Sequence, residues 1–356
     1  MNNNDIIKNR FDIPQERFYT ENIEKTLKNL KTIVSKFSKN IDLKSFSNYI
    51  LTEKFDQFIL FIWWSQIAWS LSPFMHTYSW YLDWKKVFYI LLDISKKWKW
   101  NLSYILEEIQ KRKNILWCNI TMPYKIEAYK KLKNVWQLDD SALLVWAVNT
   151  IWKRNWEIIW FNTDIEGIIL PIKNKNIDSR NAYIFWAWGA WMSAIAGCLL
   201  LWVKNIFVFN RSEEKLEKIK EHFYSEDVKK LLEKKWIDWY KINCLKYDVK
   251  INETLVSNII KEKWIIINTL PFWFKNELPK MPISKEQLLK IIPKIELLFD
   301  VVYDINYEIT PILSSVLQKG IPVINWKEMV IYQAKKWFEL WTWKNFNEEN
   351  FLSLLN

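Results

Sequence analysis

Glycine is nearly absent from this chain. The 356 residues include only 4 glycines, although average usage of about 7% would give roughly 25 in a chain of this length. Glycine is the residue that adopts left-handed backbone geometry without strain, and turns and helix ends depend on it. The chain contains 25 tryptophans instead, and the two counts together approach ordinary glycine usage.

Tryptophan occurs where a tight turn is expected. Residues 183–185 are a strand-like apolar run and residues 192–201 are a helix-like run, yet Trp186, Trp188 and Trp191 lie in the turn between them. With glycine at these three positions, the turn would read G-A-G-G-A-G. That is the dinucleotide fingerprint, in which glycines allow the turn, the approach of a pyrophosphate and the contact between helix and strand.

Two further tryptophans stand at glycine-like positions. Asn155-Trp156 lies between two strand-like runs, as an Asn-Gly hairpin turn would, and Trp202 ends a helical run where left-handed geometry is expected. We interpret most Trp letters as UGA codons that the organism reads as glycine. The alternative is a protein that is truly rich in tryptophan.

Cysteine, histidine and long apolar runs are also scarce. Cys118, Cys198 and Cys244 are isolated and have no CxxC spacing, which excludes a disulfide framework or a cysteine zinc site and favours a reducing cytoplasm. Of the two histidines, we expect His76 to be buried or capping and His222 to lie in a charged surface helix. No metal site is expected. We see neither a signal peptide nor a run long enough to span a membrane.

The chain is basic, with a net charge of +11. Such a charge attracts nucleic acid or acidic lipid, and it equally suits a cofactor that carries phosphate. Because the lysines are scattered rather than clustered, we expect neither a nucleic-acid nor a membrane partner.

Strand-like and helix-like runs alternate from residue 58 onward, which indicates an α/β fold. We expect a polar, helical extension of unknown role at 1–57 and an α/β domain at 58–164. A Rossmann-type dinucleotide domain follows at 165–325, and a C-terminal helical segment at 326–356 packs back on the first domain. The expected strands are 58–62, 87–92, 115–121, a hairpin around 155, 183–185, 206–209, 265–268, 297–302 and 322–324.

The end of the second strand of the dinucleotide unit indicates which cofactor binds. An acidic residue there selects NAD, whereas an Arg accommodates the 2′-phosphate of NADP. Here the strand is followed by Asn210, Arg211 and Ser212, with Lys215 one helical turn further on. The sequence therefore favours NADP, although Arg211 could also be a solvated surface residue.

Several motifs, in order, resemble the shikimate dehydrogenase family over roughly residues 58 to 345. They are Ser70-Leu-Ser-Pro73 with Met75-His76, Asn119-Ile-Thr-Met-Pro-Tyr-Lys125, Ala147-Val-Asn-Thr150, Asn162-Thr-Asp164, Asn210-Arg-Ser-Glu-Glu-Lys215, Asn268-Thr-Leu-Pro-Phe-Trp273, Asp300-Val-Val-Tyr303, Thr310-Pro311, Trp326-Lys-Glu-Met329 and Gln333-Ala334. The family pattern has glycine at Trp64, Trp146, Trp186, Trp188, Trp273, Trp326 and Trp343, whereas Trp341 matches a genuine tryptophan.

The resemblance implies an α/β substrate domain, a Rossmann-type NADP domain and a C-terminal helix that returns to the first domain. It also implies reversible, NADPH-dependent reduction of 3-dehydroshikimate to shikimate, on the route to chorismate and the aromatic amino acids. One alternative is a quinate/shikimate dehydrogenase with relaxed substrate or cofactor choice. Another, if the Trp letters are literal, is a basic, aromatic-rich binding protein without catalytic activity.

The same resemblance assigns roles to residues of this chain. The catalytic pair is Lys125 and Asp164. The substrate ligands are Ser70, Ser72, Asn119, Thr121, Asn149, Tyr303 and Gln333, and the cofactor ligands are Trp186, Ala187, Trp188, Gly189, Ala190, Asn210, Arg211, Ser212, Lys215, Val301 and Trp326. Taken alone, Lys125 would be one more surface lysine, and Asn119 and Asn149 could be turn or cap residues. We expect a cytoplasmic enzyme that is a monomer or a homodimer.

Overall fold

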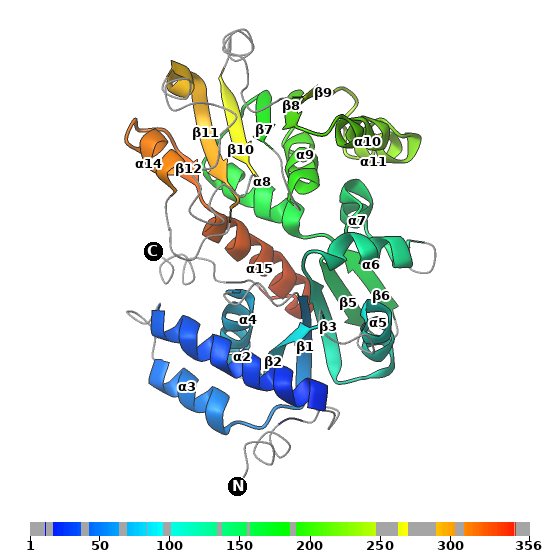
Figure 1. Cartoon of the computed structure of the whole chain (residues 1–356), viewed down its shortest axis with the longest axis vertical. Coiled ribbons are helices and arrows are strands. Elements are labelled where there is room, and N and C mark those ends of the chain that lie inside the picture. The colour runs from blue at the N-terminus through cyan, green and yellow to red at the C-terminus, as the bar shows by residue number, and fades with distance from the viewer. Residues whose placement is uncertain are drawn as a thin grey trace. The chain divides into compact units, whose positions relative to one another are not determined.

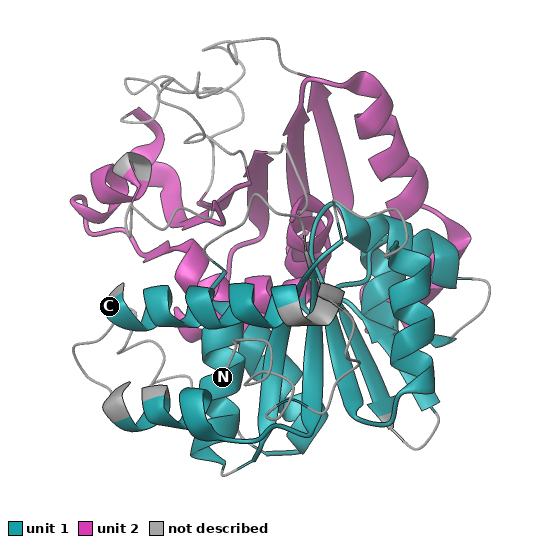
Figure 2. Cartoon of the chain, turned by 60° about the horizontal axis from the view of Figure 1, so that its bottom comes forward, with its two compact units in different colours: residues 1–163, 333–356 teal, residues 164–332 magenta. Residues whose placement is uncertain are grey.

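The computed structural model divides the chain into two compact units (Figure 2). One comprises residues 1–163 and 333–356, and the other comprises residues 164–332. The structure describes residues 11, 17–36, 43–63, 70–83, 85–94, 101–133, 137–154, 157–185, 190–246, 263–269, 290–302, 310–344 and 346. Trp64, Trp156, Trp186, Trp188 and Trp273 lie outside these ranges.

A six-stranded sheet forms the centre of the first unit, with strand order β2-β1-β3-β5-β6-β4 (Figure 1). The strands are β1 (Gln57–Trp63), β2 (Val87–Asp93), β3 (Ile115–Ile120), β4 (Gln137–Leu138), β5 (Thr150–Arg154) and β6 (Glu157–Phe161). The parallel pairs β1·β2 and β1·β3 are buried and apolar, whereas β5 and β6 form an antiparallel hairpin. The predicted hairpin is confirmed, although its turn at 155–156 is not among the described residues.

The helices of the first unit are α2 (Arg17–Lys36), α3 (Leu43–Thr52), α4 (Ser72–Leu82), α5 (Leu102–Lys111), α6 (Tyr124–Leu132) and α7 (Asp140–Val145). Each of the helices α4 to α7 comes directly before or after a strand in the chain, as expected for α/β units. Pro73 lies in the first turn of α4, where its missing N–H costs nothing. Helix α15 (Trp326–Thr342) begins in the second unit and ends in the first.

Helix α2 runs along the edge strand β2. Thr26 Oγ1 accepts a hydrogen bond from the backbone N–H of Leu91 at 2.9 Å, and Asn22 Oδ1 accepts one from Asp93 at 3.0 Å. Lys25 Nζ lies 3.5 Å from the Asp93 carboxylate. An edge strand normally exposes such N–H groups, so two side chains of α2 take the place of a neighbouring strand. The polar N-terminal extension is therefore an integral part of the first unit.

Replacing Thr26 by Val should lower the free energy of unfolding by about 1–3 kcal/mol, because the buried N–H of Leu91 would lose its acceptor. Thr32→Val on the same helix is the matched control, since Thr32 donates only to its own helix at Lys28 O. That control should change stability by no more than about 0.5 kcal/mol. Equal losses in urea denaturation would contradict the role of Thr26.

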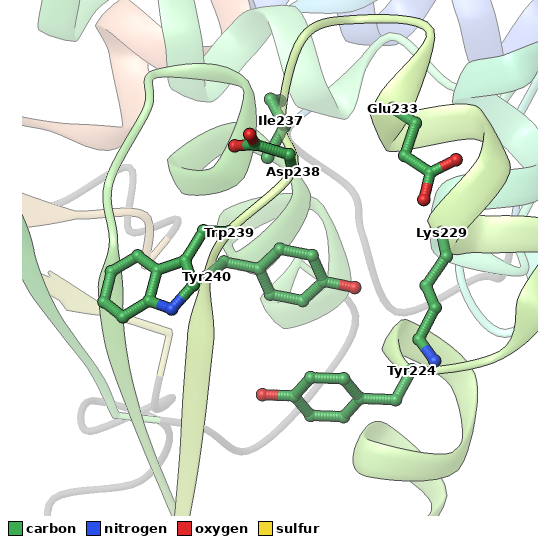
Figure 3. Close-up of a pocket in the computed structure, with 7 residues that line it drawn as sticks. All are labelled: Tyr224, Lys229, Glu233, Ile237, Asp238, Trp239 and Tyr240. Carbon is green, nitrogen blue, oxygen red and sulfur yellow. The ribbon is translucent and has the colours of Figure 1, made fainter.

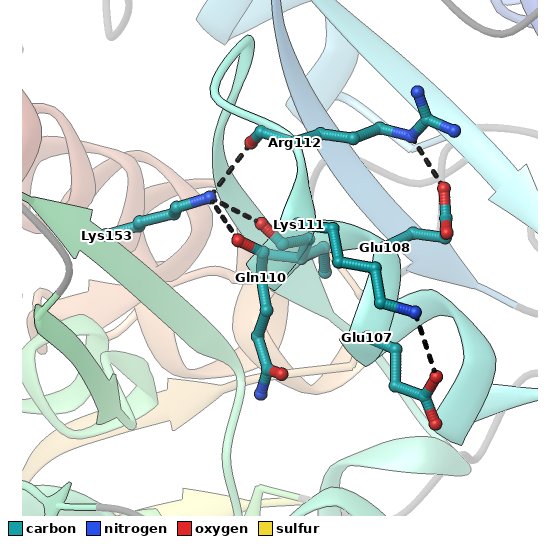
Figure 4. Close-up of polar contacts among 7 residues, drawn as sticks. Glu107, Glu108, Gln110, Lys111, Arg112 and Lys153 are labelled. Carbon is teal, nitrogen blue, oxygen red and sulfur yellow. Dashed lines mark hydrogen bonds and ion pairs between the residues drawn. The ribbon is translucent and has the colours of Figure 1, made fainter.

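Lys153 on β5 caps the C-terminus of α5 (Figure 4). Its ammonium donates to the carbonyls of Ile109 at 2.7 Å, Gln110 at 3.0 Å and Arg112 at 2.9 Å. The last carbonyls of a helix have no partners within it and carry the negative end of its dipole. The ammonium of Lys153, which extends from β5, thus satisfies three of these carbonyls. Partial burial lowers the pKa of Lys153.

Lys153→Met is expected to destabilise the protein by about 1–3 kcal/mol, because three acceptors lose a charged donor while the apolar stem is kept. Lys111→Met is the control in the same region, since Lys111 forms only an exposed pair with Glu107. An exposed pair of that kind contributes at most about 1 kcal/mol. Thermal unfolding of the two variants tests this prediction: Lys153→Met must lower the stability more than Lys111→Met does.

The second unit contains a six-stranded sheet in the order β12-β11-β10-β7-β8-β9, and all its pairs are parallel. The strands are β7 (Asn181–Phe185), β8 (Asn205–Asn210), β9 (Lys241–Lys246), β10 (Trp264–Asn268), β11 (Ile295–Asp300) and β12 (Val323–Ile324). The chain runs outward from β7 to β9 and then returns to β10 on the other side of β7. This reversal is the switch point of a doubly wound fold, and the predicted α/β class is confirmed.

The helices of this unit are α8 (Asp164–Asn174), α9 (Trp191–Leu200), α10 (Glu213–Phe223), α11 (Glu226–Glu233), a 3₁₀ turn (Ile292–Lys294) and α14 (Pro311–Leu317). Gly197 lets α9 approach α8, since a Cβ there would lie 2.8 Å from Ile168 Cγ2. None of the described helices is both long and apolar enough to cross a membrane.

Helix α11 and the strands β4 and β9 are not among the elements expected from the sequence. The Lys- and Glu-rich stretch after α10 contains α11 and the edge strand β9, whose mixed composition hides the period of either element. His222 lies in the charged helix α10, as expected, but its side chain is on the buried face: it is 3% exposed, and its ring centroid lies 4.9 Å from that of Phe223. Helix α10 is amphipathic, and His222 falls on its buried face.

Candidate active site

Two buried serines lie just beyond the end of β1. Ser70 and Ser72 are each 7% exposed, and Ser72 is the first residue of α4. The backbone N–H of Ser72 donates to Ser70 Oγ at 3.3 Å. Ser70 Oγ therefore accepts from the first backbone N–H of the helix, which holds Ser70 against the start of α4.

Three further predicted residues lie in β3 or shortly after it. Asn119 is in the strand itself, and Thr121 comes directly after it, with its N–H bonded to Ile62 O at 3.0 Å. The Thr121 carbonyl accepts from Tyr124 N at 3.0 Å, which turns the chain into α6. Lys125 lies half-buried in the first turn of this helix, and its carbonyl accepts from Val148 N at 3.0 Å.

Asn119 and Asn149 belong to one buried hydrogen-bond network. Asn119 Nδ2 donates to Thr150 Oγ1 at 3.2 Å, and Thr150 Oγ1 donates to Asn149 Oδ1 at 2.8 Å. The backbone N–H of Thr163 also donates to Asn149 Oδ1, at 2.9 Å. Both asparagines thus use side-chain atoms to join β3, β5 and the N-T-D segment, which is a different structural role from that of a turn or cap residue.

Asp164 and Gln333 are buried, at 3% and 9% exposure. Asp164 is the first residue of α8 and of the second unit, whereas Lys125 lies in the first unit. Gln333 lies on α15, in the part that belongs to the first unit. One turn further along α15, the indole of Trp337 donates to Thr163 Oγ1, which ties the helix to the residue before Asp164.

The start of α9 is a candidate anion site. Residues 186–189, which include Trp186, Ala187, Trp188 and Gly189, lie outside the described ranges. Ala190 is the N-cap of α9, and it offers no side-chain cap. The first turn also contains no acidic residue. A helix start without a side-chain acceptor suits a phosphate, because its backbone N–H groups and dipole favour negative charge.

The end of β8 carries the predicted cations. Asn210 Oδ1 accepts from Ser212 N at 2.7 Å, and Ser212 caps α10 by accepting from Lys215 N at 3.4 Å. The side chains of Arg211 and Lys215 are exposed. The turn is thus fixed by the protein's own hydrogen bonds, and its two cations reach the surface.

A second buried network lies at the ends of β10 and β11. The Asp300 carboxylate accepts from Thr310 Oγ1 at 2.8 Å, Asn268 Nδ2 at 3.1 Å and Val302 N at 3.2 Å. Burial raises the pKa of Asp300. Val301 N donates to Asn268 O at 3.0 Å, so the predicted Val301 is held at this edge.

The other predicted residues are placed only in part. Trp326 is buried at the start of α15, and Tyr303 lies outside the described residues. Within the described ranges, no three His, Cys, Asp or Glu side chains gather as a metal site would require.

The hollow shown in Figure 3 is distinct from these residues. Seven residues line it: Tyr224, Lys229, Glu233, Ile237, Asp238, Trp239 and Tyr240. The two tyrosine rings stack at 5.4 Å, with one hydroxyl donating to Phe223 O and the other accepting from Ile242 N at 2.9 Å. The tyrosine hydroxyls thus serve the fold, and none of the motif residues lines this hollow.

Comparison with known proteins gives a consistent result. A sequence profile described as the shikimate dehydrogenase substrate binding domain matches residues 62–151. A protein from Pelagibacter ubique named shikimate dehydrogenase (NADP(+)) is 30% identical over 281 residues, which cover 76% of this chain and 88% of that protein. The chain belongs to the shikimate dehydrogenase family. The resemblance carried by the ordered motifs is therefore confirmed.

Other members of the shikimate dehydrogenase family agree. A relative from Caldicellulosiruptor bescii with the same name is 28% identical over 261 residues, which cover 72% of this chain and 80% of that protein. Among solved structures, a shikimate dehydrogenase in complex with NADP+ matches with a TM-score of 0.64 and 24% identity, over 84% of this chain and 94% of that one. That likeness supports the fold.

One buried side chain beside the family motifs was missed in the sequence. Tyr89, in the middle of β2, donates its phenolic hydrogen to Asn119 Oδ1 at 2.8 Å. In the sequence, Tyr89 is only one aromatic letter in the apolar run Val87–Asp93. Its role depends on which strand lies next to which, and no local pattern contains that information.

Proposed function

We propose that this chain is an NADP-dependent shikimate dehydrogenase, which catalyses the reversible reduction of 3-dehydroshikimate to shikimate. The observation that carries the proposal is family membership, with 30% identity to a protein of that name over most of both chains. The enzyme would act in the synthesis of chorismate and the aromatic amino acids. We propose a cytoplasmic location, consistent with the three free cysteines, and a monomer or homodimer.

The second unit offers groups that fit the cofactor. The uncapped start of α9 suits the pyrophosphate, and Arg211 and Lys215 suit the 2′-phosphate. Asn210 and Ser212 fix the turn that carries these cations, while Val301 is a further proposed cofactor ligand, held by its N–H bond to Asn268 O. When bound, NADPH supplies the hydride that reduces the ketone.

We assign the substrate to residues of the first unit. Ser70 and Ser72 would bind the carboxylate by converging neutral donors, with Tyr303 assisting, and Thr121 would line the substrate pocket. Asn149 and Gln333 would bind ring hydroxyls. Asn119 makes hydrogen bonds within the protein through both its amide oxygen and its amide nitrogen, so we give it a supporting part in the same site.

Lys125 and Asp164 carry the proton chemistry in this proposal. Negative charge develops on the ketone oxygen during reduction, and the Lys125 ammonium would stabilise it and donate the proton. Asp164 would accept a hydrogen bond from the same hydroxyl and orient it. In the oxidative direction, Lys125 would accept the proton that it donates in the reductive one.

We further propose that most Trp letters stand for glycine. Backbone geometry supports this, because four of the five described non-glycine residues with positive φ are tryptophans: Trp146 (50°), Trp202 (63°), Trp236 (63°) and Trp343 (60°). All four follow closely on the end of a helix, where glycine is the usual residue. The left-handed geometry predicted at Trp202 is confirmed, and a residue other than glycine there costs about 1–2 kcal/mol.

Side-chain environments support the same proposal. Trp236 is 81% exposed and Trp343 is 74% exposed, although large apolar side chains are normally buried. Five buried indoles, those of Trp80, Trp117, Trp160, Trp264 and Trp341, have N–H groups with no hydrogen-bond partner in the described part of the chain. A buried Trp usually has such a partner. Trp341 shares this feature, and we retain it as tryptophan because it matches a tryptophan of the family pattern.

A spectrophotometric assay tests the function. The glycine-decoded protein is incubated with NADP+ or NAD+ and with shikimate or quinate, and nicotinamide reduction is followed in each of the four combinations. We expect the highest kcat/KM with shikimate and NADP+. A preference for quinate or for NAD+ would favour the relaxed dehydrogenase, and no reduction in any combination would refute the proposal.

A further inference from the structure

The last residues of three neighbouring strands form one row at the carboxyl edge of the second sheet (Figure 1). Asn268 of β10 pairs in register with Phe185 of β7 on one side and with Asp300 of β11 on the other. Thr269 fixes this edge further, because its backbone N–H and its hydroxyl donate to Phe185 O at 2.8 and 3.0 Å. Asp300 therefore lies two strands, or about 10 Å, from the end of β7.

The hydrogen bonds to Asp300 indicate an ionised carboxylate. The three partners that the structure describes for it are all donors. Val302 N can only donate, and Asn268 presents its Nδ2. Thr310 Oγ1 accepts from Leu313 N at 3.5 Å, so its own hydrogen is available to Asp300 at 2.8 Å. An ionised carboxylate can only accept, which suits three converging donors.

The charge of Asp300 is buried and has no counter-ion in the described part of the chain. The side chain is 1% exposed, and none of the described ion pairs of the second unit includes it. A buried charge without a counter-ion costs folding free energy. Asparagine has the same shape and would accept from Val302 and Asn268 without that cost. The fold alone thus does not explain why this position carries a charge.

The cofactor proposed above would bring a positive charge to this edge. In a doubly wound sheet, a dinucleotide lies across the carboxyl ends of the strands, with its pyrophosphate at the turn after the first strand. That strand is β7 here. Arg211 follows β8, which pairs with β7 on the side away from β10, so the adenosine half would lie over β8. The nicotinamide half would then extend toward β10 and β11, and its ring is cationic when oxidised and neutral when reduced.

We propose that Asp300 sets the redox preference of the cofactor site, because its buried negative charge stabilises the oxidised cofactor relative to the reduced one. The carboxylate acts through its electric field and needs no contact with the ring. The same charge would stabilise the positive charge that develops on the ring as hydride leaves, which favours reduction of the ketone. This inference rests on the proposed function.

Asp300→Asn in the glycine-decoded protein tests the role of the charge, because the shape of the side chain is kept. We expect Kd for NADP+ to rise about tenfold, as for the loss of an opposite charge about 10 Å away in a protein interior, and Kd for NADPH to change less than about twofold. Titration of NADPH fluorescence gives Kd for NADPH. Displacement of bound NADPH by NADP+ gives Kd for NADP+.

Two control variants separate the charge from the structure around it. Thr310→Val removes one of the three hydrogen bonds but keeps the carboxylate, so the ratio of the two dissociation constants should stay unchanged. Asp227→Asn makes the same change in net charge at an exposed position in the first turn of α11. Both constants should then stay within about twofold of the parent.

The outcomes distinguish this inference from the proposed function. If the parent binds both forms but Asp300→Asn weakens them equally, or leaves NADP+ binding unchanged, the inference fails and the function stands. The same holds if Thr310→Val shifts the ratio as much as Asp300→Asn does. The parent itself should bind NADP+ at least as tightly as NADPH, and the reverse order would overturn the inference without any variant. If the folded parent binds neither form, the proposed function fails as well.

Discussion

Lys125→Ala is expected to lower kcat for shikimate oxidation by about 10³-fold, within the range typical of a lost general acid–base group. The half-buried lysine lies in the first turn of α6, directly after the strand that carries Asn119. Its ammonium would stabilise the charge on the reacting oxygen, and alanine supplies neither that charge nor a proton. Steady-state kinetics at saturating NADP+ measure the loss.

Lys130→Ala on the same helix is the control, because Lys130 is exposed in the last turn of α6. It removes the same charge from the protein, and kcat should stay within about twofold of the parent. Affinity for NADP+, measured by fluorescence titration, should be unaffected in both variants. A kcat near that of the parent for Lys125→Ala would exclude it as the catalytic acid.

The second large effect concerns the turn between β7 and α9. In the glycine-decoded protein, restoring Trp at 188 should weaken NADPH binding by about 10³-fold or more. Pyrophosphate reaches the helix start only where glycines allow the backbone to approach it. We expect an indole at 188 to occupy the space that the phosphates need. Titration of NADPH fluorescence gives the dissociation constant of each protein.

Restoring Trp at 343 instead is the matched control. That position has positive φ and is 74% exposed, close behind the end of α15. Trp there should destabilise the protein by about 1–3 kcal/mol through backbone strain, with no change in NADPH affinity. Tight NADPH binding by the protein with Trp188, or UGG codons in the gene at 186 and 188, would contradict the glycine reading.

Much of the fold is visible in the sequence because it depends on local patterns. The apolar runs that become β1, β2 and β10 are buried strands, and Pro73 and Ser212 mark the starts of α4 and α10. Motif residues such as Ser72 and Asn119 come at strand ends or helix starts. Their order along the chain is enough to indicate the family.

The features that the sequence does not contain depend on contacts between distant residues. Tyr89 can donate a hydrogen bond to Asn119 only because β2 and β3 both flank β1. Thr26 accepts the hydrogen bond of the Leu91 N–H because α2 runs along the edge strand β2, although the two residues are 65 positions apart in the sequence. Strand β9 was missed because an exposed edge strand tolerates the polar residues that conceal its pattern.

Transfer of deuterium tests the central claim most directly. The glycine-decoded protein is given 3-dehydroshikimate and NADPH that carries deuterium at its transferable position, and the product is analysed by mass spectrometry. A hydride transferred directly to the substrate should yield shikimate one mass unit heavier, at a rate that falls about 10³-fold in Lys125→Ala. Shikimate without deuterium, or no shikimate at all from the folded protein, would contradict the account.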